Sequence, residues 1–268
     1  MKSISIIIPA FNEQLIIKST LTKLHKWAIM QKKYSVNLLI INDGSKDTTE
    51  KIIKDFINNN PDTNYVKLIN TDHIGQQNAT LTGIKAFKSD YYLIVEADYP
   101  VSIEFYESML IESNKFDIVQ GSRNLKESEV IGRNIVRKII SKCLSKIFRM
   151  MFVINVTDPQ IGSKIFNHNV SEYILNDLTM KHDGMKMTEI LVRAYCLGFK
   201  IKEMPIKYKE NNDSKQVPIN IFKITKLIKV VLLAFLALIK LYYVLKKEEK
   251  RGLLKHSPFK KNILFKLL

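Results

Sequence analysis

Short apolar runs alternate with longer amphipathic segments through the first half of the chain. Runs rich in β-branched residues predict strands, and apolar residues that recur every three or four positions predict helices between them. The expected strands are 3–8, 37–41, 65–69 and 91–96, and the expected helices are 13–30, 48–58 and 76–88. Strands separated by helices predict an α/β fold with a mostly parallel central sheet and right-handed crossovers.

The pattern changes from about residue 117 onward. Further strands are expected at 117–121, 157–166 and 199–208, and further helices at 131–154, 186–197 and 219–245. In the helix expected at 131–154, basic residues cover one broad face and apolar residues gather on the opposite face. The basic set is Arg133, Arg137, Lys138, Lys142, Lys146 and Arg149, and the apolar set is Val136, Ile139, Ile140, Cys143 and Ile147. This pattern is typical of a basic amphipathic helix.

The tail helix expected at 219–245 is apolar but short of a membrane span. Its uninterrupted apolar stretch covers only 230–239, whereas a spanning helix needs about 20 apolar residues. Lys226, Lys229 and Lys240 share one helical face, and Lys223 lies to its side. This arrangement favours a helix that lies in the membrane interface, and a short tilted span with snorkelling lysines is the alternative.

Composition adds a strong positive charge to this picture. The 268 residues include 42 Lys and Arg against 26 Asp and Glu, a formal net charge of +16. Residues 201–268 hold 16 basic and 5 acidic residues, a net of +11, so most of the excess lies in the last quarter. Such a block indicates a polyanionic partner: nucleic acid, an anionic membrane surface or a phosphorylated ligand. Two cysteines, Cys143 and Cys196, exclude a disulfide framework and fit a reduced, cytosolic setting.

Polar clusters follow each expected strand of the first half. They are Asn12-Glu13, Asp43-Gly44-Ser45-Lys46-Asp47, Asp72-His73 and Glu96-Ala97-Asp98. Parallel sheets bind ligands at the carboxyl ends of their strands, so these clusters predict a site there. The alternative for any single cluster is that loops are polar in most proteins.

Two of these clusters suggest specific chemistry. Glu96 and Asp98 flank Ala97 directly after an apolar strand, and both carboxylates can reach a hard divalent cation that also binds a diphosphate. Asp43 follows another strand and can accept hydrogen bonds from a base or a ribose. The alternative is an Asx turn that caps the next helix, with Asp47 as the capping residue.

The order of these motifs resembles that of the family 2 glycosyltransferases of the GT-A fold. The motifs that carry the resemblance are Ile6-Ile7-Ile8-Pro9-Ala10-Phe11-Asn12-Glu13, Ile41-Asn42-Asp43-Gly44-Ser45-Lys46-Asp47-Thr48 and Glu96-Ala97-Asp98. The second half is similar to the dolichol- and polyprenyl-phosphate glycosyltransferases, through Gly121-Ser122-Arg123, Arg137 with Ser141, Asp158-Pro159-Gln160-Ile161-Gly162-Ser163-Lys164 and Gly198-Phe199-Lys200-Ile201-Lys202-Glu203-Met204-Pro205. The resemblance covers residues 3–215 and implies a GT-A domain at 1–215, followed by a membrane-associating helical region at 216–268.

The resemblance also implies a role for individual residues. The nucleotide sugar is expected to contact Pro9, Phe11, Glu13, Asp43, Ala97, Lys209 and Ser214. A divalent cation, Mg²⁺ or Mn²⁺, is expected on Glu96 and Asp98, and the acceptor phosphate on Arg123, Arg137 and Ser141. The residues expected to be catalytic are Asp98, Arg123, Arg137 and Lys215, of which Lys215 ends a loop that closes over the diphosphate. A sugar or base role is implied for Asp158, Gln160 and Glu189.

Several positions depart from the family pattern or have a plainer interpretation. Glu96 stands where the family usually has Asp, and Pro100, which has no side-chain donor atom, stands where some relatives supply a further metal ligand. The geometry of ligation is therefore expected to differ from that of the family. Lys209 and Asn212 replace the Arg and Gly of the family's closing loop. Arg137 has a plainer alternative as part of a solvated basic face. Glu189 has one as a surface carboxylate that pairs with Arg193.

Three hypotheses follow from these observations. In the first, the protein transfers one sugar from a GDP- or UDP-linked donor to a polyprenyl or dolichyl phosphate, with inversion, on the cytoplasmic face of the membrane as a peripheral or C-terminally anchored enzyme. In the second, the acceptor is a sugar hydroxyl in a surface glycan, and Asp158, Asp183 or Glu189 is the catalytic base. In the third, a non-catalytic protein binds anionic lipid or nucleic acid. Nucleic acid is not an expected partner, because the basic residues alternate with aliphatic runs and no known nucleic-acid motif is present.

Overall fold

The computed structural model describes residues 1–60, 65–99, 101–133, 135–175, 178–179, 183–209 and 221–259. At positions 136, 137, 174, 183 and 221–230 this description covers the backbone alone. Expected positions that fall outside it are Pro100, Asn212, Ser214 and Lys215, together with the side chains of Arg137, Asp183, Lys223, Lys226 and Lys229.

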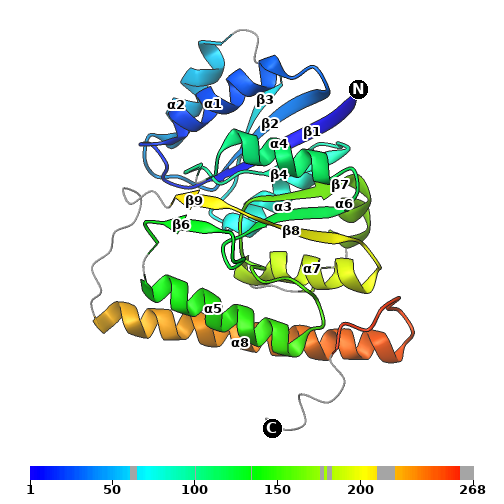
Figure 1. The fold of residues 1–268 in the computed structure, drawn as a ribbon. Coiled ribbons are helices and arrows are strands. Elements are labelled where there is room, and N and C mark those ends of the chain that lie inside the picture. The colour runs from blue at the N-terminus through cyan, green and yellow to red at the C-terminus, as the bar shows by residue number, and fades with distance from the viewer. Residues whose placement is uncertain are drawn as a thin grey trace.

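A seven-stranded sheet forms the centre of the molecule, in the order β3-β2-β1-β4-β7-β5-β8 (Figure 1). Its strands are β1 (Lys2–Ala10), β2 (Tyr34–Asn42), β3 (Val66–Asn70), β4 (Tyr91–Ile94), β5 (Ile118–Ser122), β7 (Lys164–Asn167) and β8 (Ile201–Pro205). Neighbouring strands are parallel, except that β7 runs antiparallel to both β4 and β5. This confirms the expected α/β fold with a mostly parallel sheet.

Helices cover both faces of this sheet, because successive strand residues point to opposite sides. The helices are α1 (Ile17–Met30), α2 (Thr49–Asn58), α3 (Gln76–Ala86), α4 (Ile103–Glu112), α5 (Ile135–Met151), α6 (His168–Ile174), α7 (Lys186–Cys196) and α8 (Ile221–Lys250). On β1, Ile6 and Ile8 pack with α1, α2 and α4, whereas Ile7 belongs to the core beneath α3 and α7. The alternation of one strand thus divides the apolar residues between two cores.

Three segments differ from the sequence-based prediction. The strand expected at 157–166 starts only at Lys164, because the backbone N–H groups of Thr157 and Asp158 bond to the Glu203 carboxylate instead of to a neighbouring strand. The helix expected at 131–154 is shorter, and Glu129–Ile131 forms a strand, β6. The strand expected at 199–208 is divided at Ile206 into β8 and β9 (Lys207–Lys209), and β9 pairs with β6. Helices α4 and α6 were not expected.

Helices α5 and α8 lie side by side below the sheet (Figure 1). Phe148 and Met151 of α5 and Leu238, Leu241 and Leu245 of α8 are buried in the same core. The α8 helix extends beyond the expected end at 245 to Lys250. Within the described residues, no helix is both long enough and apolar enough to cross a membrane.

Candidate active site

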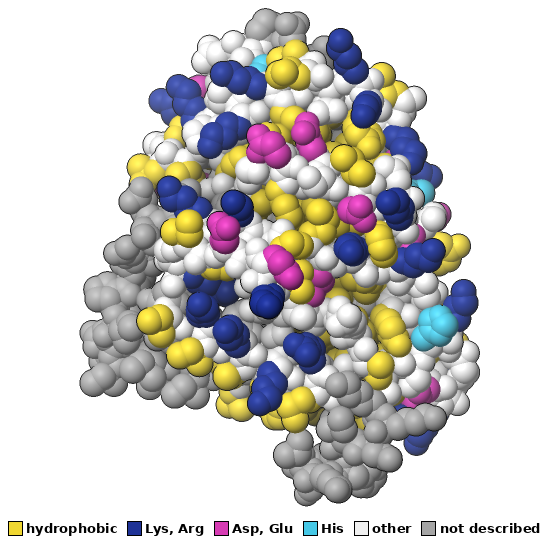
Figure 2. All heavy atoms as spheres, viewed as in Figure 1, with side chains coloured by type: hydrophobic (Ala, Val, Ile, Leu, Met, Phe, Trp, Pro, Cys, Tyr) yellow, Lys and Arg dark blue, Asp and Glu magenta, His cyan; other side chains and the backbone are white. Residues whose placement is uncertain are grey.

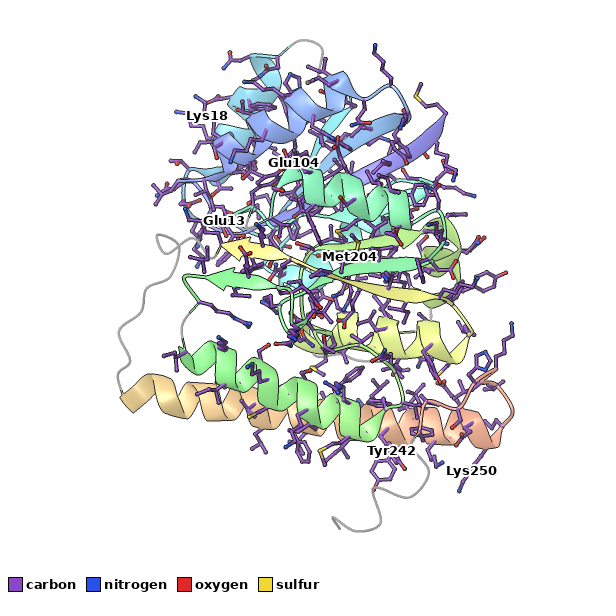
Figure 3. The ribbon with its side chains drawn as sticks, viewed as in Figure 1. Glu13, Lys18, Glu104, Met204, Tyr242 and Lys250 are labelled. Carbon is purple, nitrogen blue, oxygen red and sulfur yellow. The ribbon has the colours of Figure 1, made fainter. Side chains whose placement is uncertain are left out.

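The carboxyl ends of the parallel strands carry unusual backbone conformations. Asn12 follows β1, His73 follows β3 and Tyr99 follows β4, and all three have positive φ angles of 55°, 49° and 47°. Such conformations cost free energy in residues with a side chain and tend to cluster where a ligand binds. Figure 3 shows Glu13 at this same edge, where the strands end. The strand ends expected from the sequence to form a site are therefore gathered at one edge of the sheet.

Asp43 organises the turn between β3 and α3. Its side chain is buried, and its carboxylate accepts hydrogen bonds from the Thr71 hydroxyl (2.8 Å) and from the backbone N–H groups of Ile74 (2.7 Å) and Gly75 (2.9 Å). Asp47 accepts from the backbone N–H of Thr49 at the start of α2, whereas the N-cap position itself is Thr48, which makes no side-chain cap bond. Asp43 thus braces the loop that presents His73.

An aromatic pair lies over this loop. The rings of Phe11 and His73 are stacked with 4.1 Å between their centroids, and the His73 ring nitrogen Nδ1 lies 3.2 Å from the Asp43 carbonyl oxygen. Pro9 is buried at the end of β1, and the Glu13 backbone N–H donates to the Thr49 hydroxyl. The residues expected at the base and ribose are thus brought together with His73, which the sequence did not single out for a role.

Glu96 is held beneath a glycine. A Cβ atom added at Gly162 would approach the Glu96 Cδ and Cγ atoms to 2.5 Å, so the glutamate side chain fills the space that a larger residue would take. The Glu96 Oε2 atom is buried and has no hydrogen-bond partner among the described residues. Burial and the nearby Asp98 carboxylate raise the pKa of Glu96 to about 7.

The carboxylates of Glu96 and Asp98 have the chemistry that a divalent cation needs in its ligands. An unpartnered buried carboxylate oxygen is costly unless a cation or a donor binds it, and oxygen is the ligand atom that Mg²⁺ and Mn²⁺ prefer. Among the described residues no cluster of three or more His, Cys, Asp or Glu side chains could hold a metal by itself. The remaining ligands of a cation here would come from water and from the donor's diphosphate.

Lys164 is a buried cation that the sequence-based expectations left without a role. Its side chain is fully buried on β7, and its Nζ atom donates to the Ile161 carbonyl oxygen at 2.6 Å. Burial lowers the pKa of Lys164 to about 7, although the carboxylates of Asp158, Glu203 and Glu96 act in the opposite direction. The sequence signal was present, since Lys164 ends the Asp158–Lys164 motif.

Arg123 is oriented by two neighbours. Its Nε and Nη2 atoms donate to the two carboxylate oxygens of Asp158 at 2.6 and 2.9 Å, and its Cζ atom lies 5.4 Å from the Tyr208 ring centroid. Burial alone would raise the pKa of Asp158, but the bonds from Arg123 outweigh it and the pKa lies below its ordinary value. The Nη1 atom of Arg123 has no hydrogen-bond partner within the described part of the chain.

Glu203 braces this ion pair from β8. Its carboxylate accepts from the backbone N–H and the hydroxyl of Thr157, both at 2.7 Å, from the Asp158 N–H at 3.0 Å and from the Gln120 amide at 2.9 Å. Four hydrogen bonds to one carboxylate leave the Thr157–Asp158 turn little freedom. The position of Arg123 therefore depends on a residue 80 positions further along the chain.

A cavity of about 350 Å³ opens beside Arg123, between the sheet and helices α5, α7 and α8. Its polar lining is Arg123, Arg133, Ser141, Ser145, Asp158, Gln160, Thr188 and Tyr208, and its apolar lining is Ile140, Leu144, Phe148, Pro159, Met185 and Leu238. The apolar side chains come largely from α5 and α8. The cavity thus combines a polar group of residues around an arginine with a wall suited to hydrocarbon.

Other expected site residues lie apart from this cavity or outside the description. Glu189 is fully buried and accepts from Arg193 Nε and from the Thr179 N–H and hydroxyl, all at 2.8 Å. The pairing with Arg193 was anticipated, but at the surface rather than in the interior. Lys209 is exposed on β9. The Arg137 side chain, Ser214 and Lys215 fall outside the described residues.

Comparisons with known proteins show the family and the fold of this chain. The model of the family described as glycosyl transferase family 2 matches residues 5–175. A dolichyl-phosphate beta-glucosyltransferase from Dictyostelium discoideum is 29% identical over 226 residues, which is 80% of this chain and 69% of that protein. In structure, the chain resembles glucosyl-3-phosphoglycerate synthase from Mycobacterium tuberculosis, solved with Mn²⁺, UDP and glucosyl-3-phosphoglycerate. That match has a TM-score of 0.62 and 13% identity, and covers 90% of this chain and 80% of that one.

A second solved structure shows the same fold with a different nucleotide. The mannosyltransferase PcManGT from Pyrobaculum calidifontis, in complex with GDP-Man and Mn²⁺, matches with a TM-score of 0.54 and 14% identity, and covers 80% of this chain and 58% of that one. At these identities the likeness concerns the fold alone.

Proposed function

Because this chain belongs to glycosyl transferase family 2, and is therefore a glycosyltransferase of the GT-A fold, we propose that it transfers one sugar from a nucleotide sugar to the phosphate of a polyprenyl or dolichyl lipid. The similarity to dolichyl-phosphate beta-glucosyltransferases supports this acceptor class. The donor is a UDP- or GDP-linked sugar.

The observation that carries this proposal is the two-sided cavity. A lipid phosphate needs cationic donors for its head and an apolar wall for the first units of its chain. Arg123 and Ser141 line the polar part, while Ile140 and Leu144 of α5 and Leu238 of α8 line the apolar part. The unpartnered Nη1 of Arg123 suits a charge-assisted hydrogen bond to a phosphate oxygen.

The reaction is a single displacement. An oxygen of the acceptor phosphate forms a bond to the anomeric carbon, the bond from that carbon to the nucleoside diphosphate breaks, and the configuration inverts. A phosphate monoester has a second pKa of about 6, so the nucleophile is already anionic at neutral pH and needs no base. Arg123, with Arg137, brings this anion against an anionic donor.

The described carboxylates favour a phosphate acceptor over a hydroxyl acceptor. A hydroxyl needs a general base, for which Asp158, Asp183 and Glu189 were candidates. The side chain of Asp183 lies outside the described residues. Asp158 accepts from Nε and Nη2 of Arg123, and its lowered pKa makes it a weak base. Glu189 is buried against Arg193 and does not line the cavity.

Glu96 and Asp98 would hold the divalent cation, Mg²⁺ or Mn²⁺. When bound there, the cation would offset the negative charge of the donor's diphosphate. Pro9, Phe11, Glu13 and Asp43 surround the nucleoside, and Ala97 lies between the two carboxylates. In this proposal Lys209, Ser214 and Lys215 belong to the segment that covers the diphosphate.

Helices α5 and α8 provide a surface for the membrane that carries the acceptor. We call this surface the two-helix platform: the exposed apolar residues Ile135, Ile139, Met150, Leu232, Leu236 and Tyr243, flanked by exposed Lys138, Lys142, Lys146, Arg149, Lys240 and Lys247. Figure 2 shows basic and apolar side chains side by side in the lower part of the molecule, where α5 lies. On α8 the exposed stripe of Leu232, Leu236 and Tyr243 is apolar, and Lys240 lies beside it. This arrangement suits insertion of the stripe into an anionic membrane leaflet. We place the enzyme on the cytoplasmic face of the membrane, with 1–215 as the catalytic part and 216–268 as the membrane-associating part.

Radiolabelled donors test the reaction. Full-length protein would be incubated with UDP-glucose or GDP-mannose, Mn²⁺ and vesicles that contain a polyprenyl phosphate. We expect an organic-extractable, acid-labile glycolipid that is lost on chelation. Arg123→Ala should lower its formation about 100-fold, because the phosphate loses a charge-assisted hydrogen bond, whereas exposed Arg251→Ala should not. Absence of a glycolipid with every common donor would refute the proposal.

A further inference from the structure

Four hydrogen-bonding groups form a continuous chain from helix α7 through α3 and back to α7. The Met187 backbone N–H donates to Gln77 Oε1 at 3.0 Å, and Gln77 Nε2 donates to Gln160 Oε1 at 3.3 Å. Gln160 Nε2 donates in turn to the Thr188 hydroxyl oxygen. Gln77 was not singled out by the sequence, and neither was Thr188.

The direction of this chain is set at its first member. A backbone N–H can only donate, so the side-chain oxygen of Gln77 must face Met187 and its amide nitrogen must face Gln160. The same reasoning then orients the Gln160 amide, whose nitrogen faces Thr188. Every bond therefore points the same way, toward the Thr188 oxygen, and successive bonds of this kind polarise one another.

The hydroxyl proton of Thr188 ends the chain at the cavity. Thr188 is buried and lines the cavity, and its oxygen already accepts from Gln160. Its proton has no acceptor in the part of the chain that the structure describes, so it is available to a bound molecule. A buried hydroxyl that accepts one bond, lines a cavity and has no protein acceptor for its proton can donate to a molecule bound there.

The chemistry of the chain indicates which part of a substrate it meets. Its members are amides and a hydroxyl without a formal charge, whereas the charge of Arg123 serves the phosphate. Arg123 and Ser141 already serve the acceptor phosphate in the proposed function. The other oxygens that a bound nucleotide sugar would bring to this cavity, beyond its diphosphate, are the sugar hydroxyls.

We propose that Thr188 donates a hydrogen bond to one hydroxyl of the transferred sugar, and that Gln77 and Gln160 are positioning residues that aim this bond. The inference rests on the proposed function and adds to it a determinant of sugar choice. It predicts that the cavity distinguishes sugars at one hydroxyl through a residue on α7.

Calorimetric titration of the full chain with Mn²⁺ tests this inference without any acceptor. UDP and UDP-glucose, or GDP and GDP-mannose, serve as paired probes. Thr188→Val should weaken binding of the sugar nucleotide about tenfold and leave binding of the nucleoside diphosphate unchanged. Thr188→Ser should restore the affinity, and Gln77→Met should lower it in part, because Thr188 keeps its hydroxyl but loses its orientation.

Deoxy-sugar donors identify the hydroxyl. We expect one deoxy analogue to bind the native chain about tenfold more weakly than the parent sugar. In Thr188→Val the parent sugar and this analogue should bind equally, because neither can then form the bond to Thr188. Thr80→Val, at a buried threonine of α3 that bonds to the Gln76 carbonyl, is the matched control and should bind both probes normally.

The outcomes separate the two proposals. Normal discrimination among sugars in Thr188→Val, or equal weakening of UDP and UDP-glucose, overturns the role of Thr188 while the transfer reaction stands. If the native chain binds neither UDP-glucose nor GDP-mannose and forms no glycolipid from any common donor, the proposed function falls and this inference falls with it.

Discussion

At position 96 the family usually has an aspartate, and Gly162 provides the room for the longer glutamate found here. The carboxylate carbon of Glu96 lies only 2.5 Å from the position that a Cβ at 162 would take, so the sizes of the two residues are coupled. An acid one methylene longer can thus occupy this site because the facing residue has no side chain.

We expect Gly162→Ala to damage the metal site more than the fold. The added Cβ would force the flexible end of Glu96 to move, and displaced ligands or their supporting groups typically weaken metal binding about 10- to 100-fold. Titration of Mn²⁺ by electron paramagnetic resonance, with UDP present, measures the affinity, and thermal unfolding measures stability.

Gly252→Ala provides the opposite pattern as a control. Gly252 has a φ of 71° and open space around its Cα, so alanine should cost about 1 kcal/mol of stability and leave Mn²⁺ affinity unchanged. Unchanged Mn²⁺ affinity in Gly162→Ala would contradict this account of Glu96.

The buried ion pair of Arg123 and Asp158 should make the free energy of unfolding depend on pH in the acid range. The pKa of Asp158 is lowered in the folded protein, so its contribution to stability is present above about pH 4 and is lost as the pH falls through the folded pKa. Asp158→Asn leaves the Arg123 guanidinium buried without a counter-charge, which should cost about 3 kcal/mol at pH 7. Urea unfolding should show this difference shrinking as the pH falls toward 3.

The exposed Asp55 on α2 supplies the matching control. Asp55→Asn should change stability by less than about 0.5 kcal/mol at either pH. A destabilisation in Asp158→Asn that stays constant from pH 7 to pH 3 would contradict the ionic origin of its effect.

Among the elements, α8 is joined to the body of the molecule by a charged bridge as well as by apolar packing. Arg193 of α7 donates to Glu189 on its own helix and to both carboxylate oxygens of Glu248 on α8, at 3.1 and 3.2 Å. Because α8 also contributes Leu238 to the cavity, this bridge connects the platform to the site.

Arg193→Met should therefore loosen α8. It removes the counter-charge of fully buried Glu189 and the link to Glu248, at a cost of about 3 kcal/mol in the free energy of unfolding. Urea unfolding and limited proteolysis within α8 measure the effect. Lys54→Met, in an exposed pair with Glu50, should leave the unfolding midpoint unchanged. If both variants behave alike, the bridge does not hold α8.

At the scale of the whole molecule, charge and apolar surface meet on the two-helix platform. Ile139→Glu and Leu236→Glu should each reduce binding to vesicles of phosphatidylcholine with about one third phosphatidylglycerol by tenfold or more, because each variant replaces an inserted apolar side chain with an anion. Their native side chains are 57% and 51% exposed. Flotation of the full chain with the vesicles measures binding.

Ile111→Glu is the matched control, at a residue of α4 that is 64% exposed and lies away from the platform. It should bind vesicles normally, and binding of the native chain should weaken as salt screens the flanking lysines. Normal vesicle binding by Ile139→Glu and Leu236→Glu would contradict a membrane role. A dimer of the chain that forms through this surface, detected by light scattering, would also contradict it.

The alternation of apolar and polar residues by itself determined the α/β layering and the gathering of polar residues at the strand ends. A strand's period of two assigns Ile6 and Ile7 to opposite cores, and polar residues after each strand must share one edge of a parallel sheet. The order of the motifs determined the family as well. These features could be predicted because each depends on neighbours in the chain.

Only the tertiary structure decided how the site is assembled. The partnership of Arg123 with Asp158, the support from Glu203, and the chain from Gln77 to Thr188 join residues that are distant in sequence. They meet because β7 runs antiparallel between β4 and β5, which turns the Asp158–Lys164 segment back across the strand ends. Local periodicity carries no information about that register, so the cavity and its donors depend on the folded chain.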